Sequence, residues 1–245
     1  MLELQHIHKF FNPGSVNEIC LFDDFNLTVK DGEFVSVVGS NGSGKTSMLN
    51  IICGSIDIDH GQILIDGKDY AGKKDFVRSR QIGRVFQDPS KGTCPQMTIL
   101  ENMSIAENKG KPFNLTRGVN KAHIDYYREM LAHLNLGLED KMHTPVGALS
   151  GGQRQRLTIA RALVGHPDIL ILDDSASALD YATDAALRKA LRTLPAETTL
   201  FIVSQRTSSL RHADQIIVLD DGHVVGIGTV SYTHLRAHET RGNLV

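Results

Sequence analysis

The sequence has no tryptophan, few cysteines and no long apolar run. Aliphatic runs such as Ile169–Leu172 are far shorter than the ~20 residues of a membrane helix, which excludes a membrane-spanning segment. The cysteines Cys20, Cys53 and Cys94 are widely spaced and form no CxxC pair, so we expect reduced thiols and no metal or redox site. An excess of one charge is also missing, because 26 basic residues face 28 acidic ones. This balance excludes nucleic-acid binding driven by net charge.

The 245 residues have an ordinary globular composition, with 41% apolar and 22% charged residues. Strand-like and helix-like segments alternate along the chain, which predicts a largely parallel α/β sheet. The first thirty residues read as short strands joined by a turn at Asn12-Pro13-Gly14. The compact apolar runs predicted to be buried strands are Phe34–Val38, Ile169–Leu172, Phe201–Val203 and Ile216–Leu219.

Helical patterns fill the remaining segments. A helix after residue 45 would bury Met48, Leu49, Ile51 and Ile52 and end at Gly54. From about Asp88 to Leu149 the pattern is helical, with Ile124, Tyr127, Leu131 and Leu134 at helical spacing. Gly151 to Val164 predicts a further helix, and Asp220-Asp221-Gly222 predicts a hairpin turn.

A glycine-rich loop carries the strongest chemical signal. It fits G-x-x-x-x-G-K-[ST] and lies between a predicted strand and a predicted helix, which disfavours the alternative of a chance match. Its residues are Gly39, Ser40, Asn41, Gly42, Ser43, Gly44, Lys45 and Thr46. Glycines let backbone N–H groups curl around a phosphate, and the helix start attracts the same anion. We therefore predict ATP binding, with Lys45 at the β- and γ-phosphates and the Thr46 hydroxyl on Mg²⁺.

The apolar run 169–172 ends in Asp173. In a phosphate-loop protein, such a carboxylate holds Mg²⁺, usually through water. An aliphatic strand that ends in Asp is also common for purely structural reasons. Together with the phosphate loop, the pattern favours a magnesium ligand.

A third segment makes the reading specific. The residues Leu149, Ser150, Gly151, Gly152 and Gln153 precede Arg154-Gln155-Arg156-Leu157 and Ala160-Arg161-Ala162-Leu163. In this order, between the phosphate loop and Asp173, they resemble the signature of ABC ATPases over residues 1–229. The resemblance implies one ABC nucleotide-binding domain with an α/β, P-loop (RecA-like), mostly parallel sheet. It also implies an N-terminal antiparallel β subdomain and a helical subdomain inserted at about 88–150.

The resemblance also implies roles for matching positions. Phe11 would stack on adenine, and Gln87 would sense the γ-phosphate and Mg²⁺. The signature would contact ATP bound by a second, head-to-tail ABC subunit, in a homodimer or heterodimer, and Ser177-Ala178-Leu179-Asp180 would cross that interface. The implied partner is a transmembrane permease subunit and no nucleic acid. No signal peptide is visible, so we expect a cytoplasmic protein held on the inner face of the membrane through the permease.

Two positions depart from the family pattern. Asp174 stands where the family usually has the Glu that polarises the attacking water, and Gln205 stands where it has a switch His. Asp174, Gln87, Gln205 and Lys45 are the predicted catalytic set. A shorter carboxylate can cost about 10²-fold in rate, so we expect slow hydrolysis, as in degenerate-site exporter subunits. A regulatory subunit that never hydrolyses ATP is an alternative. A non-transport ATPase acting on ribosomes or DNA would usually carry two ATPase domains or a coiled-coil insertion, neither of which is visible.

The two parts of the chain resemble different relatives, with a seam between them. Residues 1 to about 155 resemble stand-alone importer subunits for amino acids or other small solutes, whereas residues from Arg156 to Thr229 resemble a fused exporter. One hypothesis is a chimeric reading frame with no cellular role; the alternative is a divergent single gene. Residues 230–245 have no apolar period and resemble a translated sequencing adapter. We therefore expect a non-native tail and a natural chain that continues past Thr229.

Overall fold

The computed structural model describes residues 1–111, 118–119, 121–133, 137–173, 191, 194–203 and 213–229. The chain forms two compact units. The first comprises Met1–Arg78 and the chain from Thr199 onward, and the second comprises Ser79–Thr198. The predictions for Asp174, Gln205, residues 177–180 and the tail from residue 230 lie outside the described residues.

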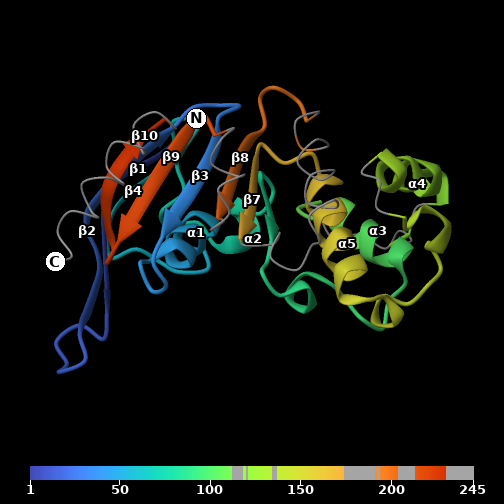
Figure 1. Ribbon diagram of the computed structural model, residues 1–245, viewed down its shortest axis with the longest axis horizontal. Helices are drawn as coiled ribbons and strands as arrows, with labels where there is room; N and C mark the ends of the chain where they lie inside the picture. The colour runs from blue at the N-terminus through green and yellow to red at the C-terminus, as the bar shows by residue number, and fades with distance from the viewer. Residues whose placement is uncertain are drawn as a thin grey trace, which may run out of the picture. The chain divides into compact units, whose positions relative to one another are not determined.

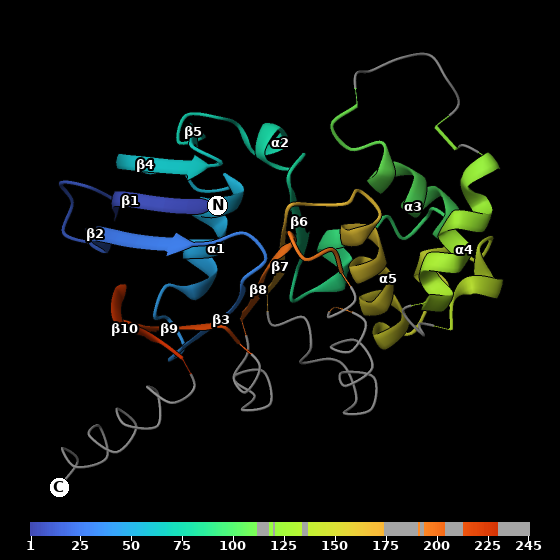
Figure 2. The ribbon, with the colours of Figure 1, turned by 90° about the horizontal axis from the view of Figure 1, so that it is seen from above.

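An antiparallel sheet forms one layer of the first unit. Its strands are β1 (Leu2–Phe11), β2 (Ile19–Val29), β4 (His60–Ile65) and β5 (Lys68–Asp69), in the order β2-β1-β4-β5 (Figure 2). The predicted pair of N-terminal strands is the hairpin of β1 and β2. Leu2 and Leu4 pair with Val29 and Leu27, and all four side chains are buried. The alternation of buried and outward residues fixes the register, because a slip of one residue would turn this apolar set toward water.

A second group of strands in the first unit carries the phosphate loop. β3 (Phe34–Gly39) pairs in parallel with β8 (Thr199–Val203) and with β9 (Gln215–Asp220), and β10 (His223–Gly228) pairs antiparallel with β9. β8 is buried along its whole length, as the apolar run predicts. Such double-sided burial is typical of parallel strands.

The described residues of the first unit also form two helices. In α1 (Lys45–Cys53), Met48, Leu49, Ile51 and Ile52 are buried as predicted, and Gly54 ends the helix at φ +80°. In α2 (Asp75–Arg78), the Arg78 side chain is fully buried and donates hydrogen bonds to backbone carbonyls, including the Ile51 carbonyl at 2.7 Å. This guanidinium satisfies carbonyl oxygens at the end of α1, where a helix accepts positive charge.

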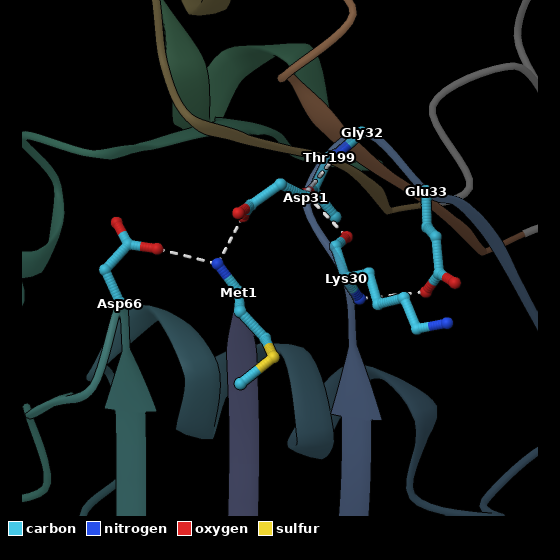
Figure 3. Close-up of polar contacts among 7 residues, drawn as sticks. All are labelled: Met1, Lys30, Asp31, Gly32, Glu33, Asp66 and Thr199. Atoms are coloured by element: carbon cyan, nitrogen blue, oxygen red, sulfur yellow. Dashed lines mark hydrogen bonds and ion pairs between the residues drawn. The ribbon is translucent and has the colours of Figure 1, made fainter.

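Turn residues of the first unit are tied together near the ends of these strands (Figure 3). The Met1 amino group contacts the carboxylates of Asp31 and Asp66. The Thr199 hydroxyl, at the start of β8, accepts a hydrogen bond from the Gly32 N–H at 3.2 Å and donates one to the Lys30 carbonyl at 3.3 Å. These contacts connect the antiparallel sheet with the turn that leads into β3.

The second unit combines a parallel strand pair with helices. β6 (Ile82–Val85) pairs in parallel with β7 (Ile169–Asp173). Its helices between residues 79 and 173, as far as they are described, are α3 (Ile99–Glu107), α4 (Ile124–His133) and α5 (Gly151–Leu163). The 3₁₀ turns of the same range are η1 (Pro89–Gly92), η2 (Lys121–His123), η3 (Glu139–Lys141) and η4 (Val146–Ala148). Tyr127 and Leu131 are buried as predicted, while Leu134 lies outside the described residues. The boundaries of the helical subdomain at about 88–150 stay a prediction.

Among the described residues, no helix is both long and apolar enough to span a membrane. Cys20, Cys53 and Cys94 form no disulfide. The described part of the chain also holds no cluster of three or more side chains suited to a metal ion.

Candidate functional site: the phosphate loop and the signature helix

The predicted phosphate loop joins the end of β3 to the start of α1 (Figure 1). The Lys45 ammonium group donates hydrogen bonds to the Gly39 carbonyl at 2.9 Å and to the Ser40 carbonyl at 2.6 Å. The lysine therefore folds back over the loop that precedes it. This places a positive charge within the loop, where a phosphate would need it.

Glycine is required at two positions of this loop. Gly42 has φ +87°, and a Cβ built there would meet no atom within 4 Å, so this corner faces open space. Gly44 has φ +94° and is the N-cap of α1. Because Gly44 has no side chain, it leaves the amide groups of the helix start to another partner. The positive φ values and the open corner suit a loop whose backbone approaches an anion.

The exposed residues of the loop supply further polar groups. Asn41 and Thr46 are exposed, whereas the Ser43 side chain is buried. Thr46 lies in the first turn of α1, where its hydroxyl oxygen is a donor atom of the kind that Mg²⁺ prefers. The loop thus combines a lysine, a helix N-terminus and a hydroxyl within eight consecutive residues.

Phe11 lies at the end of β1, where it pairs with Ile19 and is partly exposed. The Lys9 ammonium lies 5.6 Å from the centre of its ring. A partly exposed aromatic face is compatible with stacking, but the contact with adenine stays a prediction.

In the second unit, Asp173 ends β7 and pairs with an arginine that the sequence interpretation did not assign to the site. The Arg84 guanidinium lies 3.1 Å from the Asp173 carboxylate, and the two side chains are only 10% and 8% exposed. The Arg84 guanidinium also covers the Phe86 ring at 4.6 Å. In the parallel pair of β6 and β7, Arg84 lies opposite Ile171, which shares a strand face with Asp173. A prediction of this strand pairing would have indicated the contact between Arg84 and Asp173.

Gln87 follows β6 and is exposed. The backbone just before it is held by Gln155 of α5, which is fully buried and donates to the Phe86 carbonyl at 3.4 Å. The backbone next to the exposed Gln87 side chain is therefore held by α5, the helix that begins in the signature.

The signature residues form the beginning of α5. Leu149 is buried, and Ser150 is the N-cap in a capping box with Gln153. The Ser150 hydroxyl accepts from the Gln153 N–H at 3.3 Å, and the Gln153 side chain accepts from the Ser150 N–H at 3.1 Å. Gly151 and Gly152 have no atom within 4 Å of a Cβ built on them, so a large group could approach the backbone closely.

A second polar cluster of this unit surrounds Glu107 at the end of α3. His123 lies 2.8 Å from its carboxylate, Lys111 lies 3.6 Å away, and the Tyr127 hydroxyl donates to it. Burial raises the pKa of Glu107, but the hydrogen bonds from Tyr127 and His123 outweigh it and leave this pKa below its ordinary value. Burial and the same carboxylate raise the pKa of Tyr127 to about 12. No sequence motif marked this cluster.

Comparison with known proteins places this geometry in a family. Residues 22–177 match the profile of the family described as ABC transporter. The chain is 38% identical to a tyrosine transport ATP-binding protein of Clostridioides difficile, over 92% of this chain and 90% of that protein. It is 36% identical to a putative multidrug export ATP-binding/permease protein of Staphylococcus aureus, over 93% of this chain but only 38% of that protein.

A solved structure agrees. The chain matches the dimeric ATP-binding cassette MJ0796 bound to ADP and Pi, with a TM-score of 0.82 and 31% identity over 94% of this chain and 99% of that one. These matches confirm the predicted P-loop α/β fold. Both relatives match over more than nine tenths of the chain, and the seam near residue 155 stays a prediction.

Proposed function

The chain belongs to the ABC transporter family, whose ATP-binding cassettes couple ATP hydrolysis to transport, and from this premise we propose that its phosphate loop binds MgATP for that purpose. The observation that carries the proposal is the loop itself, in which Lys45 folds over Gly39 and Ser40 at the open start of α1. Lys45 would balance the charge of the β- and γ-phosphates, and backbone N–H groups would surround them. Phe11 would stack on adenine.

The donor set suits Mg²⁺. Thr46 offers a hydroxyl, Asp173 a carboxylate and Gln87 an amide oxygen, and Mg²⁺ prefers such hard oxygen ligands. Bound Mg²⁺ would neutralise the charge that develops on the phosphates during hydrolysis. The Asp173 carboxylate also lies 3.1 Å from the Arg84 guanidinium.

A second ABC subunit completes the proposed ATPase. The signature would contact the γ-phosphate of ATP held by a partner subunit arranged head to tail. The beginning of α5 supports this assignment, since its two glycines are open and its N-terminus attracts an anion. The dimeric relative MJ0796 is compatible with the same arrangement.

The proposed transport partner is a transmembrane permease subunit that holds this chain on the inner face of the cell membrane, and the proposed cargo is an amino acid or a similar small solute. The support is the relative named for tyrosine transport. This chain matches 90% of the length of that protein but only 38% of the length of the export relative. Reconstitution with a candidate permease and labelled tyrosine tests this step. ATP-dependent tyrosine uptake supports the import assignment, and its absence beside ATP-dependent export of another solute contradicts it.

Nucleotide binding and hydrolysis test the core proposal. We expect the purified chain to bind Mg·AMP-PNP and Lys45→Ala to lose that affinity, as measured by calorimetry. Equal affinity of the two proteins would contradict the assignment of the phosphate loop.

A slow ATPase is the second candidate, favoured by Asp174 and Gln205. The double variant Asp174→Glu, Gln205→His should raise kcat by about 10²-fold if carboxylate placement limits the chemistry. An unchanged kcat together with intact ATP binding would support a regulatory subunit instead.

A further inference from the structure

The turn between β9 and β10 contacts the phosphate loop. Asp221 and Gly222 have φ values of +44° and +76°, and Asp220 pairs with His223, so the predicted hairpin turn is a two-residue turn of type I′. The Gly222 N–H donates to the Ser43 carbonyl at 3.2 Å, and the Ser40 hydroxyl lies 3.4 Å from an Asp220 carboxylate oxygen. Two separate residues of the phosphate loop are thus tied to this turn.

The bond from Gly222 sets the direction of a functional amide. The Ser43 carbonyl and the Gly44 N–H belong to one planar trans peptide, in which the two groups point in opposite directions. When the turn holds the carbonyl, it also fixes the Gly44 N–H so that it points away from the turn. Gly44 is the N-cap of α1, directly before Lys45.

Close packing prevents the turn from shifting. A Cβ on Gly222 would overlap the carbonyl oxygen of Leu21 in β2, and a Cβ on Gly39 would overlap the carbonyl oxygen of Leu219. A side chain at position 222 must therefore push the turn away from β2, and the N–H that holds the Ser43 carbonyl moves with it.

The same unit contains a matched turn with no such neighbours. Asp66 and Gly67, between β4 and β5, have φ values of +50° and +72°, and Ile65 pairs with Lys68. A Cβ on Gly67 would meet no atom within 4 Å. The two Asp-Gly turns share their backbone conformation and differ in what surrounds the glycine.

We propose that the Asp220–Gly222 turn is a positioning element for ATP binding, which acts by orienting the Ser43–Gly44 peptide of the phosphate loop. The inference rests on the proposed function, since it assigns a purpose to that loop. Gly222 itself touches no nucleotide and acts through Ser43. Asp220 keeps the Ser40 end of the loop beside the turn.

Mg·AMP-PNP affinity and thermal stability of Gly222→Ala and Gly67→Ala test the proposal. Both substitutions place alanine at a similar positive φ, so both carry the same backbone cost. We expect Gly222→Ala to weaken nucleotide affinity about tenfold, the equivalent of one hydrogen bond, and Gly67→Ala to leave affinity unchanged. Wild-type affinity in a folded Gly222→Ala protein overturns the inference alone. A wild-type chain that binds no nucleotide overturns the proposed function as well.

A measurement on the wild-type chain covers the case in which Gly222→Ala does not fold. The Gly44 N–H and the Ser43 carbonyl belong to one peptide. A phosphate that binds this N–H should therefore also hold the Ser43 carbonyl in its hydrogen bond with the Gly222 N–H. Amide hydrogen exchange by NMR should then slow at Gly222 on addition of Mg·AMP-PNP and stay unchanged at Gly67. Equal behaviour of the two amides would overturn the inference.

Discussion

The beginnings of α1 and α5 differ in how their backbone N–H groups are satisfied. Every helix start leaves backbone N–H groups without a partner in the helix. At α1, the N-cap is Gly44, which has no side chain to offer, and Lys45 folds over the preceding loop. At α5, Ser150 and Gln153 close a capping box on the helix's own amides. The first start leaves its amides to an outside anion, whereas the second satisfies the Ser150 and Gln153 amides internally and keeps only its two glycines open.

Other polar side chains of the second unit are also paired within the protein. In the second unit, Asp173 pairs with Arg84, and Glu107 accepts hydrogen bonds from Tyr127 and His123. Substitutions in this pre-paired region, which comprises the Arg84–Asp173 pair and the contacts of Glu107, should mainly change the free energy of unfolding. Substitutions in the open phosphate loop should mainly change nucleotide affinity. Four substitutions test this difference, from the largest expected effect to the smallest.

Lys45→Ala should have the largest effect and should act on function. Loss of one preorganised hydrogen-bond donor to the charge that develops in a transition state costs about 10²–10³-fold in rate. We expect ATPase activity and Mg·AMP-PNP affinity to fall by about 10²-fold or more, with little change in the urea midpoint. Lys68→Ala, an exposed lysine of β5, is the control. A large loss of stability in Lys45→Ala would erase the proposed contrast.

Arg84→Met should act on stability instead. Removing one partner of a buried ion pair costs about 3–5 kcal/mol, because a buried charge is left uncompensated. Arg128→Met is the control, since Arg128 pairs with Asp125 on the surface with side chains 50% and 85% exposed. Such exposed pairs contribute about 0–1 kcal/mol. Urea unfolding of both variants checks the difference, and equal free energies of unfolding would contradict it.

The features that the sequence could predict are local, and those that it could not predict join distant segments. The phosphate loop, the buried face of α1 and the Asp220–Gly222 turn are local patterns, and each was predicted from adjacent residues. The Arg84–Asp173 pair joins residues 89 positions apart in sequence, and it depends on the register of β6 against β7. The cluster at Glu107 draws on α3, η2 and α4, so no periodicity within one segment could reveal it.

Ser150→Ala and Thr98→Ala separate capping from function within one unit. Thr98 forms the same type of capping box with Glu101 at the start of α3. Loss of either cap should cost about 1 kcal/mol of stability, measured by urea unfolding. Only Ser150→Ala should also lower ATPase activity beyond what its stability loss explains, because only Ser150 belongs to the signature. Equal ATPase activity of the two variants would contradict the role of Ser150.

Glu107→Gln should have the smallest effect and should depend on pH. The pKa of Glu107 is lowered in the folded protein, so the carboxylate stabilises the fold above its ordinary pKa of about 4.3, and this contribution disappears as pH falls through the folded value. The free energy of unfolding should therefore differ between wild type and Glu107→Gln by a constant amount near neutral pH, and by progressively less below about pH 4. Glu129→Gln, an exposed residue of α4, is the control. A difference that stays constant down to acid pH would mean that Glu107 contributes through packing and not through its charge. In either case ATP affinity should not change, because Glu107 serves the pre-paired region and has no part in the phosphate loop.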